Sequence, residues 1–297
     1  METQMQMTPN EDQHYRTLIR EIVGKATSDG AGVKLMRSLG STQGARLDPF
    51  LMLDEFSSDN PGDYIAGFPS HPHRGFETVT YMLDGQMRHE DHMGNIGELK
   101  SGGVQWMSAG RGVIHSEMPQ QDQGRMRGFQ LWINLPAKEK MTPARYRDIP
   151  STQIPVSTLS TGATVKVIAG IVVLEGQRVE GPIQGVSTAP LYLDIMLPPR
   201  TQISFDVASE HHAFVYAYEG EVNIGARVVQ NHSAGILSSG GSIQLQSQLH
   251  ETRFLVIAGR PIGEAVVQYG PFVMNTREEI EQAMRDYQNG TLTEAAS

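Results

Sequence analysis

Two short pairs of potential metal ligands stand out in the sequence. His71 and His73 are separated by one residue, and so are His115 and Glu117. Alternate side chains of a β-strand point to the same face, so both members of a pair can bind one ion. Three imidazoles and one carboxylate suit a divalent first-row metal such as iron and leave coordination positions for a substrate. We therefore predict a metal site formed by His71, His73, His115 and Glu117.

The sequence around the pairs is typical of short strands joined by tight turns. Residues 78–83 (TVTYML) are β-branched and aromatic, and Asp84-Gly85 after them is a strong hairpin signal. The chain between the pairs is long enough for a few strands to bring the pairs face to face. Strands are also predicted at 50–56, 86–92, 104–107, 113–115 and 129–136, whereas residues 15–24 fit either a short helix or a strand.

The second half of the chain resembles the first in outline. Asp84-Gly85 and Glu219-Gly220 end similar strands, and Gly102-Gly103 and Gly240-Gly241 precede similar strands. We interpret these matches as a duplication that gives two antiparallel barrels in tandem, at residues 15–145 and 156–275. Residues 146–155, within a stretch that contains Pro143, Pro150 and Pro155, are the predicted linker.

The two ends of the chain have different predictions. Residues 1–14 are polar and acidic and lack a basic segment followed by an apolar one, which favours a mobile tail over a signal peptide. Residues 276–288 predict a helix, because Thr276 and Glu279 form a capping-box pattern before one apolar face. Residues 289–297 are expected to fray.

The second half lacks the paired ligands. When the halves are set in register on Gly85 and Gly220, Asp206 takes the place of His71, Ala208 that of His73 and His212 that of Glu77. Neighbouring His211 and His212 would point to opposite faces of a strand. We expect the second barrel to bind no metal.

Composition narrows the classes of function. The formal net charge of −9 opposes direct nucleic-acid binding, which needs a basic face. The 297 residues include no cysteine, so there is neither a disulfide framework nor a thiolate metal site. No stretch has the length of a membrane span. We expect a cytoplasmic protein that binds neither nucleic acid nor membrane.

Several long motifs closely resemble the pirin family, a branch of the cupins. The resemblance runs from about residue 16 to residue 288. It is carried by HPHRGFETVTY (71–81), QWMSAGRGVIHSEMP (105–119), LWINL (131–135), DPFLMLDEF (48–56) and GPFVMNT (270–276). It implies an all-β protein of two tandem cupin (jelly-roll) barrels with a short C-terminal helix. It also implies metal in the first barrel alone, held by His71, His73, His115 and Glu117.

The resemblance implies two functions. Several pirins resemble quercetin 2,3-dioxygenases, which open a flavonol ring with O2, and Glu117 would then be the catalytic base. Others act as iron-dependent redox-sensing regulators that bind a transcription factor or a metabolic enzyme. The expected cofactor is Fe(II), while Cu, Mn, Ni, Co or Zn also fit such ligands. The expected partner is a small aromatic flavonol or another protein.

Three further residues flank the predicted ligands. Glu77 occupies the place of a ligand in many single-barrel cupins and is a candidate alternative or supporting ligand. Arg74 and Arg111 could guide an anionic substrate or form salt bridges with nearby carboxylates. The charged cluster at 88–92 (RHEDH) fits either the rim of the site or a solvated strand and turn, and we favour the latter.

Overall fold

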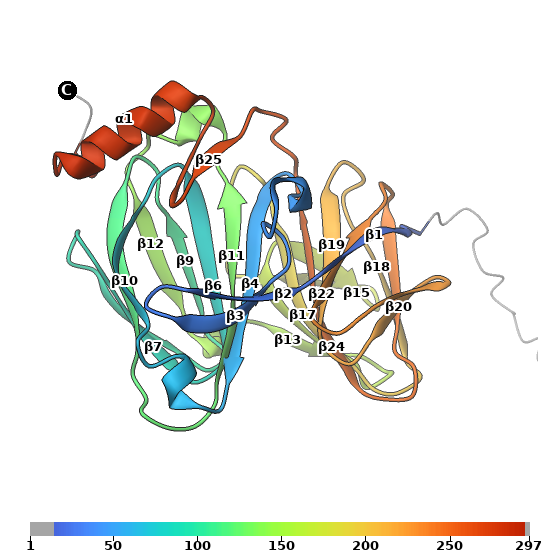
Figure 1. The fold of residues 1–297 in the computed structure, drawn as a ribbon. Coiled ribbons are helices and arrows are strands. Elements are labelled where there is room, and N and C mark those ends of the chain that lie inside the picture. Colours follow the sequence, from blue (N-terminus) through green and yellow to red (C-terminus); the bar gives the residue numbers. More distant parts are fainter. Residues whose placement is uncertain (1–14, 295–297) are drawn as a thin grey trace, which may run out of the picture.

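The computed structural model describes residues 15–294 and consists almost entirely of antiparallel strands. They form two barrels side by side, the first from the blue-to-green part of the chain and the second from the yellow-to-orange part (Figure 1). The predicted all-β fold with one C-terminal helix is confirmed. The tail predicted for residues 1–14 lies outside the described residues.

The N-terminal barrel is built from two facing sheets. In spatial order, the large sheet contains β12 (Arg145–Ile149), β9 (Val104–Ser108), β6 (Phe76–Asp84), β11 (Met126–Asn134), β4 (Phe50–Ser58), β3 (Val33–Arg37) and β2 (Lys25–Asp29). The small sheet contains β5 (Phe68–His73), β10 (Val113–Pro119), β7 (Gln86–Asp91) and β8 (Ile96–Lys100). Short 3-10 helices lie at Gln43–Ala45, Pro61–Asp63, Ala137–Glu139 and Ser151–Gln153.

The C-terminal barrel has the same design. Its large sheet contains β1 (Leu18–Val23), β22 (Ser233–Leu237), β19 (His212–Glu219), β24 (Thr252–Gly259), β17 (Leu191–Leu197), β14 (Thr164–Ala169) and β13 (Val156–Thr158). Its small sheet contains β18 (Gln202–Asp206), β23 (Ser242–Gln246), β20 (Val222–Ile224) and β21 (Arg227–Val229). Two hairpins, β15 (Ile171–Leu174) with β16 (Gln177–Glu180) and β25 (Val267–Tyr269) with β26 (Phe272–Met274), complete the strands.

The matching strand orders correct one detail of the predicted duplication. β9 and β22 occupy the same place in the two large sheets, and β10 and β23 the same place in the small sheets. Gly102-Gly103 precedes β9, whereas Gly240-Gly241 precedes β23, so these glycine pairs are not equivalent. Turn residues recur at many hairpins, which explains why this match was misleading.

The two large sheets pack against each other and join the barrels through one apolar layer. Buried side chains from both contribute, among them Val79, Phe129 and Leu131 from the first barrel and Phe214 and Leu255 from the second. Along a strand, side chains alternate between this layer and the barrel interior. The layer therefore determines which residues of the large sheet can reach a site inside the N-terminal barrel.

Each end of the chain crosses to the opposite barrel. Strand β1 pairs with β22 of the C-terminal barrel, with Leu18 opposite Leu237. Hairpin β25–β26 and helix α1 (Arg277–Gln288) lie over the N-terminal barrel, where α1 is red in Figure 1. Residues 15–23 and 267–275 therefore lie outside the barrels to which the sequence assigned them.

Two further segments differ from their predictions. Residues 145–149 fall almost entirely within the predicted linker but form edge strand β12, which pairs with β9. Helix α1 has the predicted capping box at Thr276 and Glu279, yet the chain after it does not fray as expected up to residue 294. Leu292 is 1% exposed and packs against Phe272 and Ile280.

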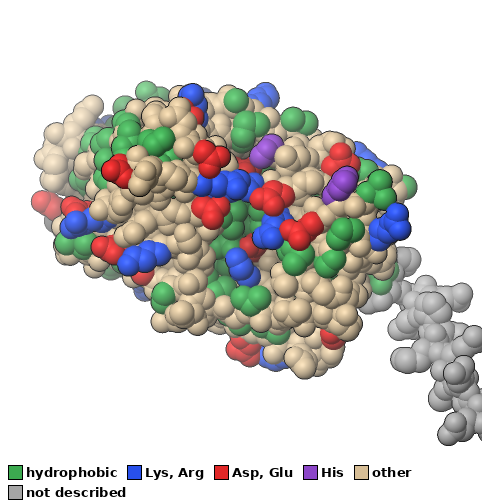
Figure 2. Space-filling view, turned by 90° about the horizontal axis from the view of Figure 1, so that it is seen from below, with side chains coloured by type: hydrophobic (Ala, Val, Ile, Leu, Met, Phe, Trp, Pro, Cys, Tyr) green, Lys and Arg blue, Asp and Glu red, His purple; other side chains and the backbone are tan. Residues whose placement is uncertain are grey.

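Ion pairs also connect the two barrels. Viewed from below, side chains of both signs lie interspersed across the middle of the molecule (Figure 2). At the start of β11, Arg127 pairs with Glu55 of its own barrel at 3.1 Å and with Glu219 of the other barrel. Within residues 15–294, no helix has the length and hydropathy needed to span a membrane.

Candidate metal centre

Strands β5 and β10 bring three of the four predicted ligands together, namely His71, His73 and His115, whereas Glu117 is not part of this cluster. They are antiparallel neighbours in the small sheet, and their register places His71 directly opposite His115. His73 and His115 are 3% and 2% exposed, and His71 is partly buried. The alternation of buried residues in β10 points His115 and Glu117 into the barrel.

The three histidines form a compact cluster. Their ring centroids are separated by 4.7 Å (His71–His73), 4.4 Å (His71–His115) and 4.9 Å (His73–His115). Each residue offers one ligand atom, and these atoms all lie within 4.8 Å of one another. Among residues 15–294, no other group of three or more His, Asp or Glu residues brings its ligand atoms this close together.

The buried environment keeps two of these imidazoles neutral. Burial lowers the pKa of His73 well below its ordinary value, and the nearby His71 lowers it further. Burial and then the neighbouring His73 and His71 likewise depress the pKa of His115. A neutral imidazole has a lone pair for a metal, and the buried Nε2 of His115 has no hydrogen-bond partner within residues 15–294. The donor set therefore fits a divalent first-row ion.

Glu117 lies on the inward face of β10 but contacts groups on the opposite sheet. Its carboxylate accepts hydrogen bonds from Thr80 Oγ1 at 3.1 Å and Gln130 Nε2 at 2.9 Å. The Trp132 indole N–H donates to Gln130 Oε1 at 3.0 Å and thereby orients the Gln130 amide. Glu117 is therefore held in a fixed orientation inside the barrel that holds the histidine cluster.

His89 is a buried neighbour of the cluster that the sequence analysis did not select. It is 1% exposed on β7, and its Nδ1 lies 3.3 Å from His115 Nδ1. Its Nε2 lies 3.5 Å from the buried Asp91 carboxylate, and its ring stacks on Tyr146 at 4.4 Å. Part of the cluster at 88–92 is thus buried rather than solvated. The two-residue spacing of His89 and Asp91 was the available signal, since it matches that of the ligand pairs.

Glu77 lies away from the histidines. Strand β5 ends at His73. Gly75, at φ +90°, then turns the chain into β6, which belongs to the other sheet. A Cβ on Gly75 would lie 2.0 Å from the Val273 carbonyl oxygen, so no larger residue fits this turn. On β6, Thr80 faces the barrel interior, whereas Glu77 lines a separate cavity between the barrels. This placement opposes its predicted role as a ligand or supporting residue.

Of the two flanking arginines, Arg74 takes one of the two roles that the sequence left open. Arg74 is 3% exposed, pairs with Asp286 of α1 at 2.6 Å and donates to the Leu292 carbonyl at 2.9 Å. It also donates to the backbone carbonyl of Arg111. Of the two roles left open for Arg74, the structure supports the salt bridge, which anchors the C-terminal segment.

A cavity of about 570 Å³ opens onto the histidine cluster. Gln130 and Trp132 line it together with His71 and His73, and one side is closed by Gln268, Gly270 and Pro271 near the C-terminus. Arg37 lies in its wall and binds both carboxylate oxygens of Asp54, at 2.7 and 2.6 Å. Its volume is typical of sites for small organic ligands.

The corresponding place in the C-terminal barrel is apolar. Strands β18 and β23 take the places of β5 and β10 in the strand order, and their inward cross-strand partners, such as Phe205 and Ile243, belong to the barrel core. Asp206, predicted to replace His71, instead accepts a hydrogen bond from Ser242 at 2.7 Å. The predicted register does not hold for these strands, because the connection from β18 to β19 is longer than the connection from β5 to β6.

Comparisons with known proteins identify the family. Residues 32–133 match the family model described as Pirin, and residues 192–293 match the Pirin C-terminal cupin domain. A provisionally named quercetin 2,3-dioxygenase of Pseudomonas aeruginosa is 52% identical over 282 residues, which cover 94% of this chain and 98% of that protein. The chain belongs to the pirin family. The human pirin is 40% identical over 274 residues, covering 90% of this chain and 91% of that protein.

Solved structures support the same relationship. The crystal structure of quercetin 2,3-dioxygenase from Acinetobacter baumannii matches with a TM-score of 0.86 and 32% identity, covering 94% of this chain and 99% of that chain. A bacterial pirin of Escherichia coli, solved in complex with nickel(II), matches with a TM-score of 0.59 and 19% identity, covering 82% and 98% of the two chains. The second match shows that the Escherichia coli protein has the same fold as the present chain.

Proposed function

We propose that this pirin is a metal-dependent dioxygenase that opens the ring of a quercetin-type flavonol with O2. The observation that carries the proposal is the cavity of about 570 Å³ in which His71 and His73 lie beside Trp132 and Gln130. It combines apolar walls for an aromatic ligand with ligands for a metal. The quercetin dioxygenase names of two relatives support this choice of substrate class.

We assign the metal to His71, His73, His115 and Glu117, with Fe(II) as the proposed native ion. A bound divalent ion would lower the pKa of a flavonol hydroxyl and supply the oxygen chemistry. The protein itself orients the ligands. His71 Nδ1 lies 2.8 Å from the Pro69 carbonyl oxygen, an arrangement that directs Nε2 toward the other two rings.

Glu117 is the proposed base for the flavonol 3-hydroxyl. One carboxylate oxygen accepts a hydrogen bond from Thr80 and the other accepts one from Gln130, and these bonds fix the orientation of the carboxylate. A proton moves from the hydroxyl to Glu117, and the substrate becomes electron-rich toward O2. The Trp132 ring, whose centroid lies 5.3 Å from that of His73, forms a wall against which the flat substrate packs.

Oxygen uptake with Fe(II)-loaded protein and quercetin tests the proposal. We expect consumption of O2 that depends on quercetin and disappears in His115→Ala. The matched control His250→Ala removes an exposed histidine of the other barrel and should retain activity. Fully loaded protein that consumes no O2 with quercetin would reject the proposal and favour the regulatory function of other pirins.

A further inference from the structure

Lys140 is a buried cation between the C-terminal segment and the N-terminal barrel. It follows the 3-10 helix Ala137–Glu139, and its side chain is 1% exposed. In the described part of the chain, no carboxylate lies within ion-pair distance of its Nζ. Burying an ammonium group without a counter-ion is costly unless other groups accept its N–H bonds.

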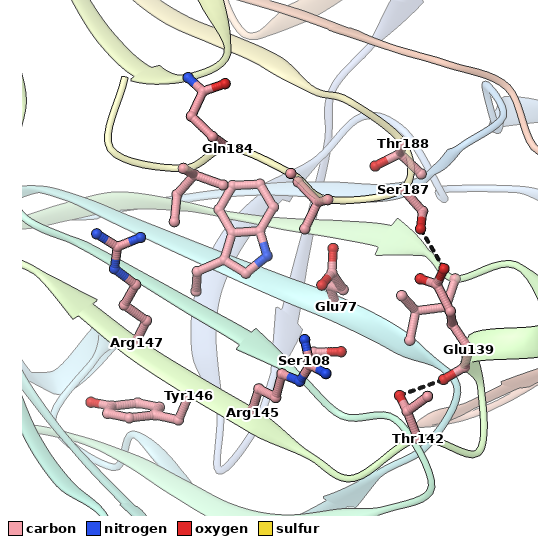
Figure 3. A pocket seen from close by; sticks show the side chains of 15 residues that line it. Glu77, Ser108, Glu139, Thr142, Arg145, Tyr146, Arg147, Gln184, Ser187 and Thr188 are labelled. Carbon is pink, nitrogen blue, oxygen red and sulfur yellow. Dashed lines mark hydrogen bonds between the residues drawn. The ribbon is translucent and has the colours of Figure 1, made fainter. Parts of the chain in front are cut away.

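The carboxylate next to Lys140 in sequence is bound elsewhere. Glu139 accepts a hydrogen bond from Ser187 in the C-terminal half of the chain, as Figure 3 shows. In the same view, Thr142 Oγ1 donates to the backbone carbonyl of Glu139 at 2.7 Å. This bond closes the turn from which the Lys140 side chain extends.

Two other carboxylates act on Lys140 from a distance. Burial lowers the pKa of Lys140 to about 8, although Glu264 and Glu279 oppose the shift. Glu264 accepts from the Ala137 amide at 2.7 Å and Glu279 from the Thr276 amide at 2.9 Å. Because neutral pH lies below the pKa of Lys140, its side chain is mainly an ammonium group with three N–H donors.

Each of the three donors of Lys140 binds a different element. Its Nζ donates to Asn134 Oδ1 at the end of β11 at 2.6 Å, to the Gly75 carbonyl at 2.7 Å and to the Val273 carbonyl of β26 at 3.0 Å. Gly75 lies in the turn between β5 and β6. One side chain thus joins β11, this turn and the C-terminal hairpin.

The three acceptors border the metal site. Gly75 is two residues after His73, and Asn134 is two residues after Trp132. The Val273 side chain packs against Trp132 and Met52, which line the histidine cavity. A shift of any of these elements would therefore move a ligand or a wall of the cavity.

Few backbone hydrogen bonds hold the hairpin to the turn. The Val273 amide donates to the Arg74 carbonyl at 3.0 Å, and the Arg74 amide donates to the Pro271 carbonyl at 3.3 Å. We propose that Lys140 is a positioning residue that fastens the C-terminal hairpin to the turn after His73 and thereby fixes His73 and the cavity wall at Pro271. The role at His73 rests on the metal assignment proposed above, whereas the role at the hairpin does not.

Hydrogen exchange at the Val273 amide tests the contact, because this amide crosses from the hairpin to the turn. Lys140→Met keeps the length of the side chain but removes the ammonium. Exchange at Val273 should accelerate about tenfold or more, because hydrogen bonds from a charged group are lost. Exchange within β24 should stay slow. Lys138→Met is the matched control, since Lys138 is 80% exposed on the same 3-10 helix. Equal exchange at Val273 in Lys140→Met and the wild type would overturn the proposal.

Metal affinity tests the positioning of His73. In competition with a chelator, Lys140→Met should bind Co(II) about tenfold more weakly than the wild type, and Lys138→Met should bind it normally. Faster exchange at Val273 with unchanged Co(II) affinity would overturn the positioning role. A wild type that binds no Co(II) would instead refute the metal assignment, while exchange at Val273 still decides the contact with the hairpin.

Chemical rescue tests whether the charge is what matters. The chain has no cysteine, so Lys140→Cys introduces a single thiol. Alkylation of the unfolded variant with 2-bromoethylamine rebuilds an ammonium group at nearly the length of lysine, whereas iodoacetamide adds a neutral amide. After refolding, only the aminoethylated protein should recover slow exchange at Val273 and Co(II) affinity. Equal recovery with both reagents would overturn the proposal.

The wild type alone provides a test that does not depend on the folding of any variant. The chain has six lysines, and a buried, fully hydrogen-bonded ammonium group exchanges its protons slowly with water. Nitrogen-15 NMR should therefore detect a protected ammonium signal from Lys140. Absence of such a signal would show that the three hydrogen bonds do not persist in solution, which also overturns the proposal.

Discussion

At the scale of single residues, the metal centre depends on neutral imidazoles inside a folded barrel. Burial disfavours the charged form of His73 and His115, so both rings keep a lone pair available near neutral pH. Their strands are fixed by backbone pairing rather than by the metal. Binding of metal and stability of the fold should therefore respond separately to substitutions.

His115→Ala should lose most of the bound metal while remaining folded. One of three clustered ligands disappears, whereas the apolar layer between the barrels and the second barrel core are untouched. Metal analysis of the purified variant, with circular dichroism as the check on folding, tests this. Full metal occupancy in the folded variant would contradict the assignment.

Glu117→Gln should separate binding of metal from turnover. The amide keeps the size of the side chain and a weak oxygen donor but cannot accept the proton. Metal should persist in part, while flavonol oxidation falls at least 10²-fold, roughly the contribution of a general base. Glu90→Gln is the control, because Glu90 is an exposed neighbour on β7. Unchanged turnover in Glu117→Gln would reject Glu117 as the base.

His89→Phe should weaken metal binding without removing a ligand. Phenylalanine retains the stack on Tyr146 but loses the nitrogen that faces His115 Nδ1. Groups that orient a ligating histidine commonly contribute about 10- to 100-fold in affinity. Competition with a chelator measures the change. An affinity equal to that of the wild type would show that His89 only fills space.

At the scale of elements, the C-terminal segment completes the N-terminal barrel. Arg74, at the turn after the ligand strand, binds both Asp286 and the Leu292 backbone. Gln268, Gly270 and Pro271 of the hairpin before α1 line the cavity at the histidines. An element distant in sequence thus shapes the entrance of the site, and its docking rests on a small apolar cluster.

Leu292→Ala should loosen the helix without unfolding the barrels. The side chain is 1% exposed, and truncating a buried leucine costs about 2–4 kcal/mol. Hydrogen exchange should accelerate in residues 271–292 and remain slow in β11. Leu249→Ala is the matched control, since Leu249 is 63% exposed. Equal exchange in both variants would show that Leu292 does not anchor the segment.

At the scale of the whole molecule, the barrels are joined by an apolar layer that also contains buried polar groups. Glu55 of the first barrel pairs with Arg127 and accepts hydrogen bonds from Tyr216 of the second barrel at 2.9 Å and His232 at 2.7 Å. The hydrogen bond to Glu55 raises the pKa of His232 above its ordinary value of 6.5, although burial opposes the shift. Contacts between the barrels are therefore linked to pH.

The contribution of His232 should disappear as pH rises. A histidine whose pKa is raised on folding stabilises fully below its unfolded pKa of 6.5 and loses this effect as pH passes its folded pKa. His232→Asn, which tolerates the positive φ of 57° at this position, should lower Tm more at about pH 5.5 than at about pH 8.5. An equal difference in Tm at both pH values would contradict the link.

The sequence alone was sufficient for the family, the two-barrel fold and the histidine cluster. Strand periodicity is local, so the spacing of His71 and His73, and the pair at His115, already placed each pair on one face. The capping box of α1 is local for the same reason. Local patterns of this kind do not show which strands are neighbours in a sheet or which element covers a given face of a strand.

Only the tertiary structure showed that Glu77 faces away from the metal, that His89 is buried beside His115, and that residues 145–149 form a strand rather than a linker. Only the structure showed that each end of the chain crosses to the other barrel. These features depend on which sheet a strand joins and which face another sheet covers. Such choices are made by contacts between residues far apart in sequence, because burying the apolar faces of both large sheets together stabilises the molecule as a whole.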